Sequence, residues 1–202
     1  MVTEQYRITG DFSTAFYLLL KKNCAPALAG HRAAILFNRN LRRDDSMIVP
    51  YKPKLEDLWF REEFMNDPET MSYNIAWGGT IPFPKEEWRD WYDRWIVHDD
   101  GNQRYYRYLL DKDRNEFVGE IAYHLDSEKN IYLANIIIYS KYRGKSYGKR
   151  GLNLLCQAAK ENGCIELYDD IAADNPSVQL FLNMGFVVDY ATEEVVMMKK
   201  VL

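Results

Sequence analysis

The chain has 202 residues and a mass of 23.8 kDa, the size of one folded domain with at most a small appendage. Because 47% of its residues are hydrophobic and 28% are charged, the composition excludes a disordered protein and predicts a buried core under an ordinary charged surface. The net charge of −4 divides into +3 over residues 1–46 and −7 over residues 47–202, which argues against a nucleic-acid surface on the main body.

Two further features bear on location and metals. No stretch approaches the roughly 20 apolar residues of a membrane-crossing helix, and the densest apolar run near the start is too short for a signal peptide, so we expect a cytoplasmic protein without a membrane span. Cys24, Cys156 and Cys164 lack the close spacing of a metal site and are odd in number. We therefore expect reduced, structural thiols and no metal.

The first 46 residues differ in composition from the rest of the chain. Apolar stretches at 15–20 and 27–37 each suit helical turns, but Pro26 would break a continuous helix between them. A basic, polar run leads to Met47, where the pattern of a compact domain starts. We therefore expect an N-terminal appendage over residues 1–46 and a catalytic or binding domain over residues 47–202.

Hydrophobic periodicity and turn residues predict the elements of that domain. Short turn-rich segments separate three strand-like runs, and connections this short imply antiparallel neighbours. Gly163 is expected to end one helix, Asn175 and Pro176 to begin another, and the glycines and prolines of 71–84 to form a loop. The pattern predicts a mixed, mostly antiparallel α/β sheet flanked by helices, with these elements: strand 48–51, helix 55–66, a helix around 88–96, strands 104–110, 117–125 and 131–139, helix 147–162, strand 166–171, a helix from 176 to the turn at Gly185, and strands 186–190 and 194–199.

The helix around 88–96 carries an aromatic stripe. Its apolar side chains recur at i, i+3, i+4, i+7 and i+8, which is the spacing of one helical face. Such a stripe indicates packing against the core, and a substrate-stacking surface is the alternative. The stripe consists of Trp88, Trp91, Tyr92, Trp95 and Ile96.

The segment 142–149, Tyr-Arg-Gly-Lys-Ser-Tyr-Gly-Lys, lies between an expected strand and an expected helix. Glycines let the backbone turn sharply and approach a ligand, and the N–H groups at a helix start favour phosphate. A P-loop would need glycine where Tyr139 stands, and a dinucleotide fingerprint would need glycine where Ser146 stands. The pattern indicates a pyrophosphate cradle, with a tight turn carrying solvated basic residues as the alternative.

Two motifs together resemble the GNAT superfamily of N-acetyltransferases. Arg143, Ser146 and Gly148 occupy the defining positions of that family's Arg/Gln-x-x-Gly-x-Gly/Ala acetyl-CoA signature, with serine in place of the first glycine. Further along, 175–186 reads Asn-Pro-Ser-Val-Gln-Leu-Phe-Leu-Asn-Met-Gly-Phe, which resembles the family's Asn-led helix ending in Gly-Phe. The resemblance covers the element order of residues 47–202 and leaves residues 1–46 unmatched.

This resemblance implies a site for acetyl-CoA between the strands that end near Tyr139 and Ile171. The backbone around Ile138 would bind the pantetheine and stabilise the oxyanion, and N–H groups of the 143–148 loop would hold the pyrophosphate. Asn175 would face the cofactor arm. The residues expected to contact the cofactor are Ile138, Tyr139, Arg143, Gly144, Lys145, Ser146, Tyr147, Gly148, Asn175 and Phe181.

The implied reaction is acetyl transfer to a primary amine. Phe181 stands where the family often has the tyrosine that protonates the departing thiolate, so another group must serve or the thiolate leaves unaided. The candidate bases are Glu120, His124 and Asp169. A carboxylate held among apolar neighbours would have a raised pKa, which suits a base. Ordinary solvated or structural roles are the alternative for all three.

The acceptor class stays open between small molecules and peptides. By family analogy, Tyr73, Trp77 and the loop 78–84 would line the acceptor side, and the acidic body favours a cationic amine. Because of Phe181, a catalytically weak acyl-CoA-binding sensor or interaction module is the alternative function. A nucleotide-binding protein of the doubly wound class is a third hypothesis.

Overall fold

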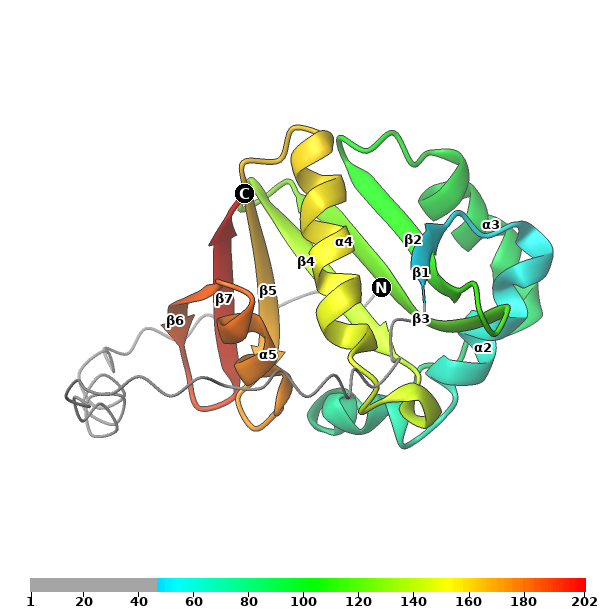
Figure 1. The fold of residues 1–202 in the computed structure, drawn as a ribbon, viewed down its shortest axis with the longest axis horizontal. Coiled ribbons are helices and arrows are strands. Elements are labelled where there is room, and N and C mark those ends of the chain that lie inside the picture. Colours follow the sequence, from blue (N-terminus) through cyan, green and yellow to red (C-terminus); the bar gives the residue numbers. More distant parts are fainter. Residues whose placement is uncertain (1–46) are drawn as a thin grey trace, which may run out of the picture.

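The computed structural model describes residues 47–202, so the expected appendage and its apolar stretches lie outside the described residues. In the described part, a seven-stranded sheet carries helices on both faces (Figure 1). The elements are β1 (Ile48–Tyr51), η2 (Leu55–Leu58), α2 (Trp59–Met65), η3 (Thr70–Trp77), η4 (Lys85–Glu87), α3 (Trp88–Tyr92), η5 (Asp93–Val97), β2 (Arg104–Asp111), β3 (Glu116–Asp126), β4 (Ile131–Ile138), η6 (Ser140–Tyr142), α4 (Tyr147–Glu161), β5 (Glu166–Ala172), α5 (Ser177–Asn183), β6 (Val187–Ala191) and β7 (Val195–Val201).

The strand order is β1-β2-β3-β4-β5-β7-β6. Strands β1 to β4 form an antiparallel meander, and β5, β7 and β6 form a second antiparallel group. The two groups meet where β4 runs parallel to β5, and Leu133 and Tyr168 are the pair that joins them. The predicted mixed, mostly antiparallel sheet is confirmed.

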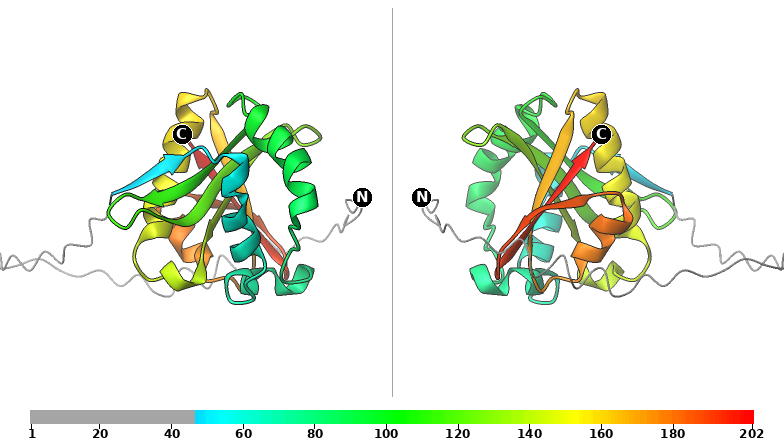
Figure 2. Two further views of the ribbon diagram at one scale, coloured as in Figure 1. Left: turned by 90° about the vertical axis from the view of Figure 1, so that its right-hand side faces the viewer. Right: turned by 90° about the vertical axis from the view of Figure 1, so that its left-hand side faces the viewer.

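Two hydrophobic cores cover the two faces of the sheet. Leu152 and Leu155 of α4 pack in the first core, and Phe60 and Phe64 of α2 pack in the second. The helices α4 and α5 lie on one side of the sheet, while α2 and α3 lie on the other (Figure 2). Because strand side chains alternate between faces, the two cores need apolar residues at nearly every strand position.

That alternation decides where the polar strand residues point. On β5, Leu167 and Ile171 belong to the core under α4, so Asp169 between them faces the same side. On β3, Ala122 belongs to the core under α2 and α3, so Glu120 and His124 face that side. The candidate residues therefore approach the middle of the sheet from opposite faces.

The element predictions hold closely from residue 104 onward. Strand β5 extends one residue beyond its predicted end, and α5 begins at Ser177, one residue later than expected. The Asn175 side chain nevertheless accepts a hydrogen bond from the Ser177 N–H (2.9 Å), which is the capping contact expected of it. Gly163 follows α4 with φ of 84°, as its predicted capping role requires.

The prediction of loop structure over 71–84 is wrong for its first half. Residues Thr70–Trp77 form the 3-10 helix η3, because Asp67 accepts the Thr70 N–H at its start (2.9 Å). Arg143, distant in sequence, donates to the carbonyl groups of Glu69 and Thr70. Local sequence signals do not show this second support.

The aromatic stripe packs as expected. Trp88 and Ile96 are buried in the second core, and Trp91, Tyr92 and Trp95 pack against it. The stripe spans α3 and the π-helical turn η5. Trp95 also meets the His124 ring edge-on, with 5.9 Å between centroids.

Candidate active site

A cavity of about 1150 Å³ opens where β4 and β5 separate beyond the Leu133 and Tyr168 pair. Tyr139 donates its N–H to Val118 on β3 (3.1 Å), and successive N–H groups of a strand point to opposite sides. The N–H groups of Ile136 and Ile138 therefore face the gap. The cavity thus has an open strand edge with unused backbone donors and acceptors, as an extended amide-bearing ligand requires.

The loop before α4 forms one end of this cavity. Gly144, Ser146 and Gly148 line it, with Gly144 at φ of 77° and Ser146 at φ of 61°. The first N–H groups of α4 have no carbonyl partner within the helix, since Arg150 makes the first intrahelical bond, to Ser146 (3.2 Å). This geometry suits an anion at the start of a 15-residue helix.

Arg143 lies differently from its expected place in this cradle. Its backbone N–H donates to Ser140 (3.0 Å), so that N–H is already used. Its guanidinium lines the cavity while donating to the carbonyl groups of Glu69 (3.1 Å) and Thr70 (2.6 Å). Lys145 is turned aside, with its ammonium 5.6 Å from the centre of the Tyr142 ring.

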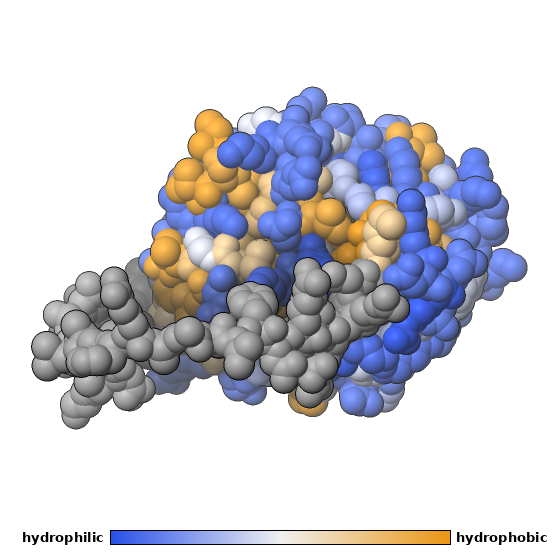
Figure 3. Space-filling model, in the orientation of Figure 1, coloured by the Kyte–Doolittle hydropathy of each residue, from blue (hydrophilic) through white to orange (hydrophobic). Residues whose placement is uncertain are grey.

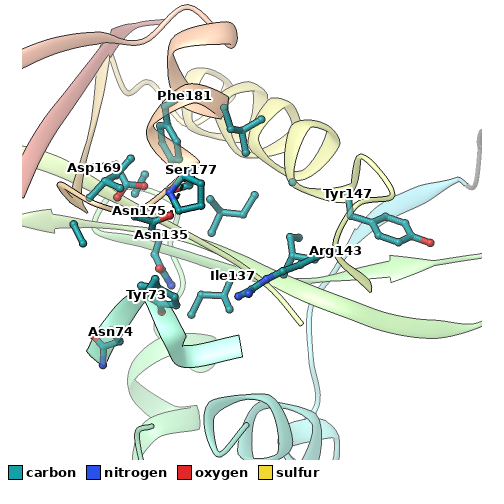
Figure 4. Close-up of a pocket in the computed structure, with 18 of the residues that line it drawn as sticks. Tyr73, Asn74, Asn135, Ile137, Arg143, Tyr147, Asp169, Asn175, Ser177 and Phe181 are labelled. Carbon is teal, nitrogen blue, oxygen red and sulfur yellow. Dashed lines mark hydrogen bonds between the residues drawn. The ribbon is translucent and has the colours of Figure 1, made fainter. Parts of the chain in front are cut away.

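The opposite wall comes from β5, α5 and the turn between them (Figure 4). Asn175 and Ser177 lie at the start of α5, and Phe181 lies one turn further along. Phe181 is 1% exposed and packs edge-on against Phe186, with 4.8 Å between ring centroids. Phe181 is therefore a core residue whose edge borders the cavity.

Asp169 is the buried carboxyl group of the site. It lines the cavity, is 8% exposed, and has no hydrogen bond or ion pair with any described residue. Burial, reinforced by the neighbouring charge of Asp170, raises the pKa of Asp169 well above its ordinary value. A carboxylate of this kind takes up a proton more readily than an ordinary aspartate, which suits a general base.

Glu120 lies in a buried cluster next to the cavity. Its carboxylate pairs with Arg61 (2.5 Å from Nη1), accepts a hydrogen bond from the Tyr106 hydroxyl, and accepts another from Asn135 (3.2 Å). The Arg61 guanidinium lies 4.7 Å from the Trp91 ring centre. Because paired buried charges are held by their partners, this geometry favours a structural role for Glu120.

His124 lines the cavity at its far end, on the side of α3. Burial, together with the positive charge of Arg104, lowers the pKa of His124 below its usual value. The imidazole is therefore largely neutral at pH 7 and can accept a proton. Of the three candidate bases, His124 and Asp169 border the cavity, and Glu120 is enclosed behind it.

Two cavity residues carry little local signal. Tyr73 of η3 lines the cavity, and its hydroxyl makes no hydrogen bond with a described residue. Asn135 interrupts the apolar run of β4 and connects the cavity to Glu120. Its polar side chain among the isoleucines of that strand is the one sequence signal that could have identified it. The side chain of Trp77 lies outside the described part of the structure.

Neither a metal centre nor a membrane segment is found in the part of the chain that the structure describes. No group of three His, Cys, Asp or Glu side chains between residues 47 and 202 could hold a metal ion. Among the helices described, none has the length and apolar character needed to cross a membrane.

Solved structures of other proteins share this fold. The spermidine N-acetyltransferase from Vibrio cholerae, in complex with CoA and spermine, matches with a TM-score of 0.64 and 19% identity over 78% of this chain and 96% of that one. The ribosomal-protein-alanine N-acetyltransferase from Brucella melitensis matches with a TM-score of 0.62 and 20% identity over 77% of this chain and 99% of that one. The putative acetyltransferase yncA from Salmonella typhimurium, with acetyl-CoA, matches with a TM-score of 0.60 and 15% identity over 77% of this chain and 94% of that one.

The fold is thus the one that acetyltransferases use. The acetyltransferase (GNAT) family model matches residues 52–186, and the chain belongs to this family. The resemblance inferred from the two motifs is confirmed. No curated protein matches the chain in sequence.

Proposed function

We propose that the protein transfers the acetyl group of acetyl-CoA to a primary amine of a small molecule or peptide. The observation that carries the proposal is the cavity between β4 and β5, with the N-terminus of α4 at one end and a buried carboxyl group in its wall. The N–H groups of Ile136 and Ile138 would pair with the pantetheine arm. The N–H groups from Gly144 to Gly148 would hold the pyrophosphate.

Asp169 would act as the base. The acceptor ammonium first loses one proton to solvent. As the neutral amine nitrogen then attacks the thioester carbon, a second proton passes to the Asp169 carboxylate, the C–N bond forms and the C–S bond breaks, and Asp169 later releases its proton to solvent. The sulfur leaves as a thiolate and takes a proton from solvent. Burial destabilises the charged carboxylate of Asp169 and raises its pKa, so Asp169 accepts the proton more readily than a solvated aspartate would.

Tyr73 would take over part of the role that Phe181 cannot perform. Burial raises the pKa of Tyr73, and the charge of Glu120 adds to the shift, so the hydroxyl stays protonated. Of the other cavity tyrosines, Tyr147 donates its hydroxyl to Asp111. Burial and the nearby charge of Glu116 raise the pKa of Tyr142 and direct its hydroxyl toward Glu116. The Tyr73 hydroxyl is therefore the tyrosine donor available to the departing sulfur or the oxyanion.

The acceptor would be a cationic amine. Asp169, Asp170 and Asp174 all line the cavity, and the body has a formal charge of −7. Opposite charge concentrates a cationic substrate near such a site. The Vibrio cholerae neighbour, whose complex contains spermine, makes polyamines a reasonable first class to test.

Calorimetry and turnover assays together test the proposal. We expect acetyl-CoA to bind and a panel of polyamines, aminoglycosides and basic peptides to include a substrate that releases CoA thiol. Folded protein that fails to bind acetyl-CoA would reject the proposal. Tight binding without turnover would instead support the acyl-CoA sensor, which Phe181 favours because it removes the family's usual acid.

A further inference from the structure

The helix η3 is joined to the loop before α4 by a set of side chains far apart in sequence. We call Asp67, Thr70, Ser140 and Arg143 the η3 latch. Thr70 begins η3 and Asp67 lies just before it, whereas Ser140 begins the short helix η6 after β4 and Arg143 directly follows that helix. Every hydrogen bond of the latch connects these two segments or fixes one side of the connection.

Asp67 is the centre of the latch. Its Oδ2 accepts hydrogen bonds from the Thr70 N–H (2.9 Å), the Thr70 hydroxyl (2.5 Å) and the Ser140 hydroxyl (2.7 Å). The Thr70 hydroxyl in turn accepts the Ser140 N–H (2.9 Å). Burial opposes ionisation, but the hydrogen bonds from Thr70 and Ser140 outweigh it and lower the pKa of Asp67. Asp67 is therefore ionised, and its bonds are charge-assisted.

Arg143 closes the latch from the other side. Its two terminal nitrogens donate to the Glu69 and Thr70 carbonyl groups, which lie next to each other at the start of η3. Arg143 can make both bonds because the guanidinium is a planar fork, whereas a lysine ammonium is a single point charge. Arg143 also borders the cavity, between Tyr142 and Gly144, where the pyrophosphate would lie.

The helix that the latch holds supplies one wall of the cavity. Ser72, Tyr73 and Asn74 of η3 all line it, and Asn74 is fixed to the end of the helix by a bond to the Gly79 carbonyl (2.7 Å). A shift of η3 relative to the loop would move Tyr73 with it. Displacing a reacting or positioning group by about 1 Å has a large effect on the rate of a reaction that depends on alignment.

We propose that Arg143 is a positioning residue, which sets the acceptor wall of η3 against the cofactor loop through the Glu69 and Thr70 carbonyl groups. This proposal rests on the proposed acetyl transfer. In this proposal the Arg143 side chain connects the acceptor wall to the cofactor loop and does not itself contact the phosphates. Binding of the cofactor to the loop before α4 would then change how well the acceptor amine binds at η3, and the reverse.

Three variants distinguish the hydrogen bonds of Arg143 to η3 from the effect of its positive charge on the phosphates. Arg143→Lys keeps the charge but loses the two-carbonyl fork. Arg143→Met loses both. Lys149→Ala removes a charge that borders the same cavity and has no bond to η3 among the described residues, so it is the matched control. Arg143 and Lys149 are exposed, and thermal unfolding of each variant verifies that it folds.

The measurements are CoA affinity by calorimetry, kcat and KM for the amine, and hydrogen exchange of residues 70–77 with and without CoA. For Arg143→Lys we expect CoA affinity within about twofold of the wild type, an efficiency toward the amine about tenfold lower, and faster exchange of η3. Arg143→Met should behave in the same way, and Lys149→Ala should weaken CoA binding and leave η3 exchange unchanged.

A different pattern would overturn the proposal. If Arg143→Lys matches the wild type while Arg143→Met loses CoA affinity and leaves η3 exchange unchanged, Arg143 acts by charge on the phosphates. The exchange measurement needs no turnover. If the wild type binds CoA and acetylates no amine, the proposed function fails, and the response of η3 to CoA in the wild type and Arg143→Lys still decides whether the latch couples the two segments.

Discussion

One carboxyl group, that of Asp169, combines a catalytic requirement with a cost to the fold. It lies on β5 between two core residues, so its charged form is poorly solvated and its pKa is raised. A group whose folded pKa exceeds its unfolded value holds its proton more tightly in the folded state. Stability is then lost as pH rises from the ordinary aspartate range toward the raised value.

Asp169→Asn should therefore lower activity and raise stability. We expect kcat with the amine to fall about 10²-fold and CoA affinity to stay unchanged. The unfolding midpoint should exceed that of the wild type near pH 8, and the difference should shrink as pH falls below about 4, where the Asp169 carboxyl becomes protonated in the unfolded state as well. Rate assays and thermal unfolding over this pH range measure both effects.

Asp170→Asn is the control, since Asp170 is exposed and follows Asp169 on the opposite face of β5. Near pH 8 its unfolding midpoint should rise less than that of Asp169→Asn, because it removes only the neighbouring charge that adds to the raised pKa of Asp169. Unchanged activity of Asp169→Asn would transfer the role of base to His124, the other candidate that borders the cavity.

Tyr73→Phe tests the proposed hydroxyl donor. Removing a hydrogen bond to developing negative charge should lower kcat at least about tenfold and leave CoA affinity within about twofold. Tyr132→Phe removes a hydroxyl from a tyrosine that does not border the cavity, and we expect wild-type kinetics from it. Equal kinetics for the two variants would mean that the thiolate leaves without help from Tyr73.

The serine in the signature motif should carry a conformational cost. Ser146 has φ of 61°, a left-handed conformation that costs a side-chain-bearing residue about 1 kcal/mol and glycine almost nothing. Ser146→Gly should therefore stabilise the protein by about 0.5 to 1 kcal/mol in urea unfolding. Asn115→Gly, at φ of 53°, should gain less, because asparagine tolerates this region. Destabilisation by Ser146→Gly would show that the serine side chain contributes a contact of its own.

At the scale of elements, the sequence predicts whatever depends on local periodicity. The strands from residue 104 onward and the helix α4 follow from alternation, from the 3.6-residue period and from Gly163. The helix η3 does not, because its supports include Arg143 and Ser140, and a window around Thr70 contains neither. The buried ion pair of Glu120 with Arg61 joins β3 to α2, so it too cannot be predicted from a local stretch of sequence.

Gly119 shows how closely two elements at the site approach each other. A Cβ added there would lie 2.2 Å from the Ile137 carbonyl oxygen on β4, and backbone cannot move aside as a flexible side chain can. Gly119→Ala should therefore cost about 2 to 3 kcal/mol in urea unfolding and displace β4 at the cavity. Gly163→Ala is the comparison: its φ is 84° with open space around it, so we expect a loss of about 1 kcal/mol and normal CoA binding. Equal losses in the two variants would show that β4 adapts.

At the scale of the molecule, the site depends on the sheet being incomplete in its middle. Both antiparallel groups are fully paired within themselves, and their cores lie on both faces, so β4 and β5 can separate without unfolding either group. The motifs indicated this opening only through the family resemblance, since periodicity does not reveal strand order. Hydrophilic surface broken by apolar patches covers most of the face seen in Figure 1 (Figure 3).

The domain boundary proposed at Met47 can be tested by deletion. Strand β1 begins at Ile48 and pairs with β2, and the Lys112 N–H donates to the Met47 carbonyl (3.0 Å), so the described residues form their own edge of the sheet. Among the described residues, both hydrophobic cores are continuous and close over the two faces of the sheet. A chain starting at Met47 should therefore stay folded and bind CoA with unchanged affinity. We expect its unfolding midpoint to lie within about 4 °C of the full chain. Aggregation, or a loss of CoA affinity in folded protein, would show that residues 1–46 belong to the domain and are not an appendage.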